Sequence, residues 1–172
     1  MKRIAYMVFR CCFLVPYWFF RVWRLGRPSD THTEQERYDY LRKIVKKVNR
    51  AGRVQVNGYG MEHLPEENGF ILFPNHQGLF DMLAIIETCP KPVGVVVKKE
   101  AAGIILVKQV IELLHGIAID RKDIRSSFEV IKQMTAEVKE GRNYVIFAEG
   151  TRSRNGNRIL EFIGGIFNFA FI

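Results

Sequence analysis

The chain has 172 residues, 48% of them apolar, and a formal net charge of +8. This length and apolar content predict one α/β domain with an appendage and leave too little chain for two full domains. Most of the excess positive charge lies in the first 27 residues, which favours an anionic membrane surface over nucleic acid as a partner. The three cysteines are odd in number and lack metal-ligand spacing, which argues against a disulfide scaffold and fits a reducing compartment.

Residues 4–23 are rich in aromatic and aliphatic side chains, but two arginines interrupt them. The longest uncharged run, residues 11–20, is shorter than the roughly 20 apolar residues that a membrane-spanning helix needs. On one continuous ideal helix, five basic residues would share an arc of roughly 100°; they are Lys2, Arg3, Arg10, Arg21 and Arg24. We therefore predict that residues 1–27 form an amphipathic helical segment that lies in a membrane interface and anchors a monotopic or peripheral protein facing the cytoplasm.

Two other interpretations of this segment remain open. A basic start followed by an apolar stretch is also typical of a secretory signal, although Trp18, Arg21 and Trp23 stand where a small-residue cleavage site is expected. The segment could instead be a core helix of the soluble domain, and Pro16 could kink it.

The remainder of the chain, residues 28–172, alternates between helix and strand patterns. In chain order these predict a helix over residues 33–50, strands over 54–57, 69–74 and 92–98, a helix over 104–114, a strand over 117–120, a helix over 122–140 and a strand over 144–147. The alternation predicts an α/β fold with a mostly parallel central sheet flanked by helices. In such folds the functional residues lie at the carboxyl ends of the strands.

One candidate catalytic pair follows the strand predicted over residues 69–74. His76 stands in a turn after this strand, and Asp81 follows five residues later. Two residues five apart on one helix point about 140° away from each other, so the pair can meet only if His76 precedes the helix and Asp81 lies in its first turn. Asp81 would then fix the imidazole tautomer and leave the other ring nitrogen to take a proton. No serine or cysteine nucleophile accompanies the pair, so that proton would come from a substrate hydroxyl.

A candidate phosphate site follows the strand predicted over residues 144–147. Residues 149–154 read Glu-Gly-Thr-Arg-Ser-Arg, and a loop of this kind can hold an anion with its backbone N–H groups and its guanidiniums. An ordinary turn is the alternative interpretation. Nothing in the sequence supplies a compact set of metal ligands, so we predict neither a metal nor a cofactor.

Four short blocks in the same order resemble the glycerolipid acyltransferase family over roughly residues 54–162. His76 and Asp81 match the HxxxxD motif of the family, and Glu149, Gly150, Thr151 and Arg152 match its third block. Residues 98–100, Lys-Lys-Glu, and residues 116–121, which end in Asp-Arg, also fit the family pattern. The resemblance implies the αβ sandwich of glycerol-3-phosphate acyltransferases.

The resemblance implies an enzyme of phospholipid biosynthesis. It would transfer an acyl chain directly from acyl-CoA or acyl-carrier protein to the sn-2 hydroxyl of 1-acyl-sn-glycerol-3-phosphate, giving phosphatidic acid. His76 would be the general base and Asp81 would orient it. The residues implied to bind or shape the pocket for the acceptor phosphate are Arg121, Glu149, Gly150, Thr151 and Arg152, with both guanidiniums as permanently charged donors. For Arg121 the alternative is an exposed residue at a helix start beside Asp123.

The end of the sequence departs from the family. After Phe162 the family usually carries a basic pair, where this sequence has Ile163 and Gly164, and the sequence stops before the fourth family block. We therefore expect an acyltransferase domain whose C-terminal part is missing. Three alternatives remain open: an acyltransferase for glycerol-3-phosphate or another lysophospholipid, a catalytically inactive protein that binds lipid surfaces, and a hydrolase that activates water through His76.

Overall fold

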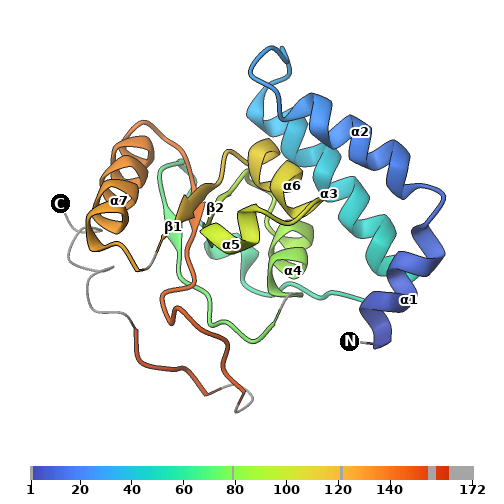
Figure 1. The fold of residues 1–172 in the computed structure, drawn as a ribbon. Coiled ribbons are helices and arrows are strands. Elements are labelled where there is room, and N and C mark those ends of the chain that lie inside the picture. The colour runs from blue at the N-terminus through green and yellow to red at the C-terminus, as the bar shows by residue number, and fades with distance from the viewer. Residues whose placement is uncertain (1, 79, 121, 155–157, 163–172) are drawn as a thin grey trace.

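The computed structural model describes residues 2–78, 80–120, 122–154 and 158–162 (Figure 1). Three helices open the chain: α1 (Lys2–Cys11), α2 (Val15–Leu25) and α3 (Glu34–Ala51). A 3₁₀ turn at Met61–His63 leads to the alternating part of the chain, which contains β1 (Ile71–Leu72), α4 (Asp81–Thr88), β2 (Gly94–Lys98), α5 (Lys99–Ala102), α6 (Val107–Leu113), β3 (Ile117–Ile119), α7 (Ile124–Lys139) and β4 (Tyr144–Val145).

The four strands form one parallel sheet in the order β1-β4-β2-β3. In the register of the sheet, Tyr144 of β4 lies opposite Ile71 of β1 on one side and Gly94 of β2 on the other. Because all four strands run the same way, the segments that follow them meet at one edge. The two segments with the candidate site residues follow β1 and β4, which are neighbours in the sheet.

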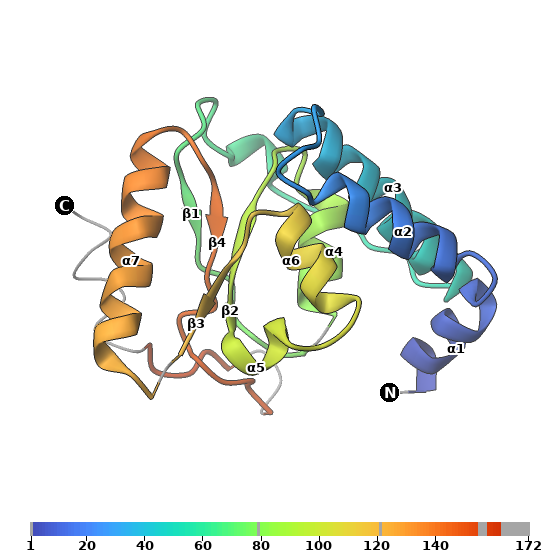
Figure 2. The same ribbon diagram turned by 45° about the horizontal axis from the view of Figure 1, so that its top comes forward.

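Helices cover both faces of the sheet, as Figure 2 shows, with α7 on one face and α3, α4 and α6 on the other. Successive residues of β4 point into two separate cores. Val145 packs with the core that includes α3 and α6, while Tyr144 and Ile146 pack with Ile131 and Met134 of α7. This alternation is the period-2 pattern of a strand that is buried on both faces, and it confirms the predicted α/β class.

The N-terminal segment does not form the single continuous helix that the arc of basic residues assumed. The chain bends by 92° between α1 and α2. Pro16 lies in the first turn of α2, where its missing N–H and fixed φ suit a helix start rather than a helix interior. Among the described residues no single helix is long and apolar enough to cross a membrane, whereas α1 and α2 together pass that test as a bent pair.

The two N-terminal helices pack against the domain through part of their apolar surface. Their buried residues are Met7, Cys11, Trp18, Val22 and Leu25. The guanidinium of Arg21 lies 5.5 Å from the centre of the Tyr40 ring on α3, so this charge faces the protein. The predicted common basic face of α1 and α2 is therefore wrong. Large aromatic side chains on both helices nevertheless remain exposed. Membrane association of residues 1–27 therefore stays a prediction.

The predicted helix over residues 33–50 is confirmed by α3. The sequence could predict its start because neighbouring residues determine it. The Thr33 hydroxyl accepts the Glu36 N–H at 3.2 Å and the Glu36 carboxylate accepts the Thr33 N–H at 2.8 Å, which forms a capping box. The strand predicted over residues 54–57 is wrong: residues 54 and 56 are half-buried and alternate with exposed residues, but the segment pairs with no described strand. The helix predicted over residues 104–114 begins only at Val107, because Leu106 has φ +73 and interrupts the helical backbone.

Candidate active site

The loop after β1 brings the predicted catalytic pair together. Nδ1 of His76 lies 2.8 Å from Oδ2 of Asp81, which is the first residue of α4. A carboxylate can only accept a hydrogen bond, so Nδ1 carries the hydrogen and Nε2 of the neutral ring is left as a proton acceptor. The arrangement is the one that the five-residue spacing required, with His76 before the helix and Asp81 in its first turn.

The Asp81 carboxylate is itself held in place by the loop. Its Oδ2 also accepts the backbone N–H groups of Gln77 at 2.7 Å and Gly78 at 2.9 Å. Three donors therefore converge on one oxygen at the start of α4, where the helix dipole also favours negative charge. This oxygen can orient the imidazole and stabilise the imidazolium that forms when Nε2 takes a proton.

The segment after β4 holds the backbone of His76 from both sides. Glu149 is 4% exposed, and its Oε1 accepts the His76 N–H at 3.0 Å. The N–H of Ser153 donates to the His76 carbonyl at 2.7 Å. The imidazole ring also packs on the Phe147 ring, with 4.3 Å between ring centres. Contacts from residues more than 70 positions away thus fix both the backbone and the ring of His76.

The second carboxylate oxygen of Glu149 and the hydroxyl of Ser153 hold the segment that follows the turn, at residues 158–160. Oε2 of Glu149 accepts the N–H of Leu160 at 3.3 Å, and the Ser153 hydroxyl donates to the Arg158 carbonyl at 2.8 Å. The sequence predicted Glu149 as part of a phosphate pocket, with Ser153 in the same loop, but gave neither Phe147 nor Ser153 a role toward His76. No local pattern marks these contacts, because they depend on β1 and β4 being neighbours.

Those predicted phosphate-binding residues that the structure describes lie at the same edge of the sheet as His76. Gly150 has φ +64 and closes a turn in which its N–H donates to the Phe147 carbonyl at 3.0 Å. Thr151 and Arg152 are exposed on this turn, so the Arg152 guanidinium is open to an anion from solvent. Arg121 lies outside the described residues.

Other charged side chains at this edge come from the ends of β2 and β3. Lys98, the last residue of β2, and Lys99, which follows it, are exposed. Nζ of Lys99 lies 3.6 Å from Oδ2 of Asp120, which follows β3. In the described part of the chain, no three His, Cys, Asp or Glu side chains are grouped so that they could hold a metal ion.

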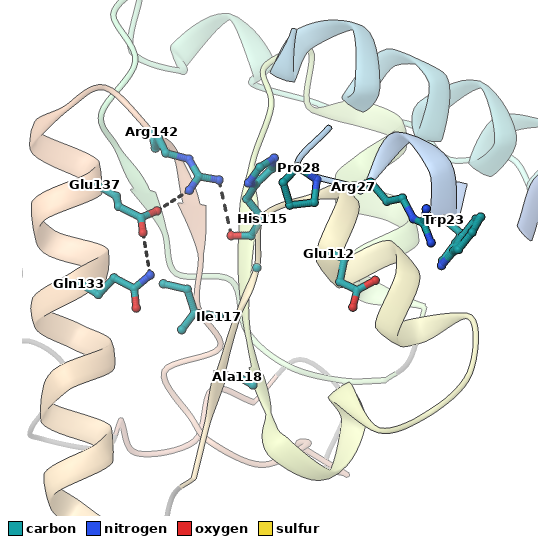
Figure 3. Close-up of a pocket in the computed structure, with 12 residues that line it drawn as sticks. Trp23, Arg27, Pro28, Glu112, His115, Ile117, Ala118, Gln133, Glu137 and Arg142 are labelled. Atoms are coloured by element: carbon teal, nitrogen blue, oxygen red, sulfur yellow. Dashed lines mark hydrogen bonds and ion pairs between the residues drawn. The ribbon is translucent and has the colours of Figure 1, made fainter. Parts of the chain in front are cut away.

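A cavity of about 710 Å³ lies at the opposite end of the sheet, beside the amino end of β3 (Figure 3). Arg142 lies on one side of it, paired with Glu137 and, at 3.3 Å, with Glu34. Trp23 lies on the other side, with the Arg27 guanidinium 3.7 Å from its ring centre. Of the predicted site residues that the structure describes, none lines this cavity, so it is separate from the sheet edge that holds His76 and Asp81.

A family model described as Acyltransferase matches residues 55–171. The chain belongs to the acyltransferase family. The matched range contains the His76–Asp81 pair and the segment that holds it. The family assignment from the four sequence blocks is thereby confirmed.

Several relatives within this family are called 1-acyl-sn-glycerol-3-phosphate acyltransferase. The one from Borreliella burgdorferi is 32% identical over 57% of this chain and 39% of its own length, and the one from Cocos nucifera is 36% identical over 56% of this chain and 31% of its own. The human 1-acyl-sn-glycerol-3-phosphate acyltransferase alpha is 28% identical over 78% of this chain and 48% of its own. The chain thus spans less than half the length of these curated relatives.

The fold of this family member is similar to a crystal structure of the 1-acyl-sn-glycerophosphate (LPA) acyltransferase PlsC from Thermotoga maritima. The match has a TM-score of 0.73 and 24% sequence identity, and it covers 98% of this chain and 68% of that one. At this identity the likeness shows the fold, and it confirms the predicted sheet flanked by helices.

Proposed function

We propose that this chain transfers an acyl group from a thioester to the sn-2 hydroxyl of 1-acyl-sn-glycerol-3-phosphate, giving phosphatidic acid. The observation that carries the proposal is the His76–Asp81 pair, in a chain of the acyltransferase family. Glu149 and Ser153 hold the backbone of His76 in place. The names of the relatives support the choice of acceptor.

In the proposed reaction, Nε2 of His76 accepts the proton of the acceptor hydroxyl as its oxygen attacks the thioester carbonyl. The new ester bond forms, the carbon–sulfur bond breaks, and the proton moves from Nε2 to the leaving thiolate. Asp81 stabilises the imidazolium that exists between these two proton transfers. The pair needs no covalent acyl-enzyme, because the acceptor hydroxyl is itself the nucleophile.

The acceptor phosphate would bind beside this pair. The exposed Arg152 supplies a planar cation on the turn after β4, and Arg121 follows Asp120 at the carboxyl end of β3 in the sequence. A phosphate held there would place the acceptor at the same sheet edge as His76. Acyl-CoA and acyl-carrier protein are the two proposed donors.

We also propose that residues 1–27 hold the protein on the cytoplasmic surface of an anionic membrane. The exposed aromatic residues of α1, α2 and the turn between them support this, because the exposed Arg10 and Arg24 on the same two helices would reach lipid headgroups. These aromatic residues are Phe9, Phe13, Tyr17 and Phe20. Co-sedimentation with vesicles of phosphatidylcholine and phosphatidylglycerol tests this part of the proposal, and loss of binding on Phe9→Ser with Phe13→Ser is expected.

The deciding experiment is acyl transfer to 1-acyl-sn-glycerol-3-phosphate in detergent micelles, with acyl-CoA and acyl-carrier protein donors compared. His76→Ala should abolish product formation. His63→Ala is the matched control, because His63 is exposed on the 3₁₀ turn and its only described ionic neighbour, Glu62, is also exposed. Equal turnover by both variants would refute the mechanism. Competition with glycerol-3-phosphate and other lysophospholipids tests the acceptor.

A further inference from the structure

The connection between α5 and α6, together with the first residue of α6, exposes four large apolar side chains in a row. Ile104 is 56% exposed, Ile105 75%, Leu106 45% and Val107 38%. Single exposed apolar residues are common on soluble proteins, but a contiguous run of this kind marks a site of interaction with another apolar surface. We call residues 104–107 the apolar loop.

The backbone holds the apolar loop in this exposed arrangement. The N–H of Leu106 donates to Oε1 of Gln109 at 2.8 Å, and the carbonyls of Ile104 and Leu106 accept the N–H groups of Lys108 and Val110. The positive φ of Leu106 breaks the helical backbone immediately before Val107, the first residue of α6. The exposure is therefore set by a hydrogen-bonded turn.

The charges around the apolar loop match an anionic surface. Lys98 and Lys99 precede it and Lys108 follows it, all three exposed. Lys99 pairs with Asp120 at 3.6 Å and Lys108 with Glu112 at 3.8 Å, and such solvent-exposed pairs are weak enough to exchange for lipid headgroups. The sequence contains no acidic residue between Glu100 and Glu112. Apolar side chains that can enter a bilayer, flanked by lysines that can reach headgroups, are the composition of an interfacial membrane contact.

The position of the apolar loop connects it to both the catalytic edge and the N-terminal helices. α5 follows β2 directly, so the loop begins at the carboxyl end of the sheet, where His76 lies. α6 packs against α2, whose Tyr17 and Phe20 are exposed. Figure 2 shows the α5–α6 connection on the same side of the sheet as α1 and α2, with α7 on the other side.

We propose that the apolar loop is a second membrane contact, which inserts into the headgroup boundary of an anionic bilayer beside α1 and α2. Two contacts on the same side of the sheet (Figure 2) would fix the orientation of the edge that holds His76, so that a lipid acceptor reaches His76 without leaving the membrane. The inference rests on the proposed membrane association of residues 1–27 and adds a separate element to it. A bilayer fits better than a protein partner because the loop is joined to α6, which packs on the helix that exposes Tyr17 and Phe20, and because it has lysines on both flanks.

Spin labels at two matched isoleucines test the proposal. In a Cys12→Ser background, which removes the exposed native thiol and leaves the buried Cys11 and Cys89, one variant carries a label at Ile105→Cys and the other at Ile124→Cys. Ile124 is 86% exposed at the start of α7, on the other side of the sheet. With phosphatidylcholine–phosphatidylglycerol vesicles, we expect the label at 105 to lie about 5–10 Å below the phosphates, protected from aqueous nickel and accessible to oxygen. The label at 124 should stay accessible to aqueous nickel.

Binding measurements complete the test. Ile104→Ser with Ile105→Ser should weaken vesicle partitioning at least tenfold, and Ile124→Ser should leave it unchanged, with circular dichroism confirming the fold of each. Vesicle binding with an aqueous label at 105 would overturn the role of the loop and leave residues 1–27 as the anchor. An absence of vesicle binding by the parent chain would overturn both proposals. A label at 105 that is protected only by self-association, seen by sedimentation without lipid, would overturn the bilayer as partner.

Discussion

Glu149 is expected to act on catalysis through the position of His76. Replacing Glu149 with Ala removes the acceptors of the His76 and Leu160 N–H groups, which it holds at 3.0 and 3.3 Å. An unpaired buried donor costs about 1–3 kcal/mol. Because the loop of His76 is only half-buried, we take the lower end for each bond and expect about 2 kcal/mol of lost stability. The freed backbone should also displace the imidazole, and a shift of about 1 Å costs roughly 100-fold in kcat.

Glu149→Gln is the conservative control for this prediction. The glutamine oxygen can keep the bond to the His76 N–H, but its NH₂ group, itself a donor, would face the Leu160 N–H. We therefore expect about a tenfold loss of kcat, which corresponds to an increase of about 1.4 kcal/mol in the activation free energy. Steady-state kinetics with varied acceptor separate two roles for the carboxylate. A positioning residue lowers kcat and leaves the KM of the acceptor within about twofold. A raised acceptor KM with unchanged kcat would refute this reasoning and favour direct contact with the phosphate pocket.

Three further substitutions, the last with a control, test the catalytic pair, a carboxylate that bonds to β4, and the packing of the sheet. Asp81→Asn keeps an acceptor but loses the charge that stabilises the imidazolium, so kcat should fall by about 10²–10⁴; a loss below threefold would contradict the role. Burial opposes ionisation of Glu137, but hydrogen bonds led by that of Tyr144 outweigh it and lower its pKa below the ordinary 4.5. Its contribution to stability is therefore complete above about pH 4.5 and lost as the pH falls through the lower folded-state pKa, so denaturation curves of Glu137→Gln should show a weaker acid dependence. Gly116→Ala would place a Cβ 2.7 Å from a carbonyl oxygen of β2 and should lower stability by about 1–3 kcal/mol in thermal unfolding. In the control Gly103→Ala the nearest atom to the new Cβ is a carbonyl oxygen 3.6 Å away, so stability should change little.

The features that the sequence predicted well are encoded by residues close together in the chain. The start of α3 depends on Thr33 and Glu36, three positions apart, and the His76–Asp81 contact depends on a spacing of five. The strand and helix pattern also predicted the parallel sheet, and with it the edge at which His76 and Asp81 lie, because buried strands and amphipathic helices leave distinct periodicities.

The features that the sequence missed depend on which elements become neighbours. The hold of Glu149 and Ser153 on His76 exists because β4 lies beside β1, and the spacing of the two segments does not reveal this order. The segment over residues 54–57 has a strand pattern but no described partner, and a strand needs one to satisfy its backbone. The bend before α2 follows from Pro16, yet its direction is set by packing on α3 and α6.

The two backbone bonds of His76 also set the point in folding at which the His76–Asp81 pair, and with it the proposed activity, can be completed. Its N–H and its carbonyl are both held by residues that lie more than 70 positions further along the chain. Closing a loop of that length costs chain entropy, and only the joining of β4 to the sheet offsets this cost. A chain in which α3 and the first strands have formed therefore still lacks an aligned imidazole, and refolding experiments should recover enzymatic turnover together with the last-formed tertiary structure and no earlier.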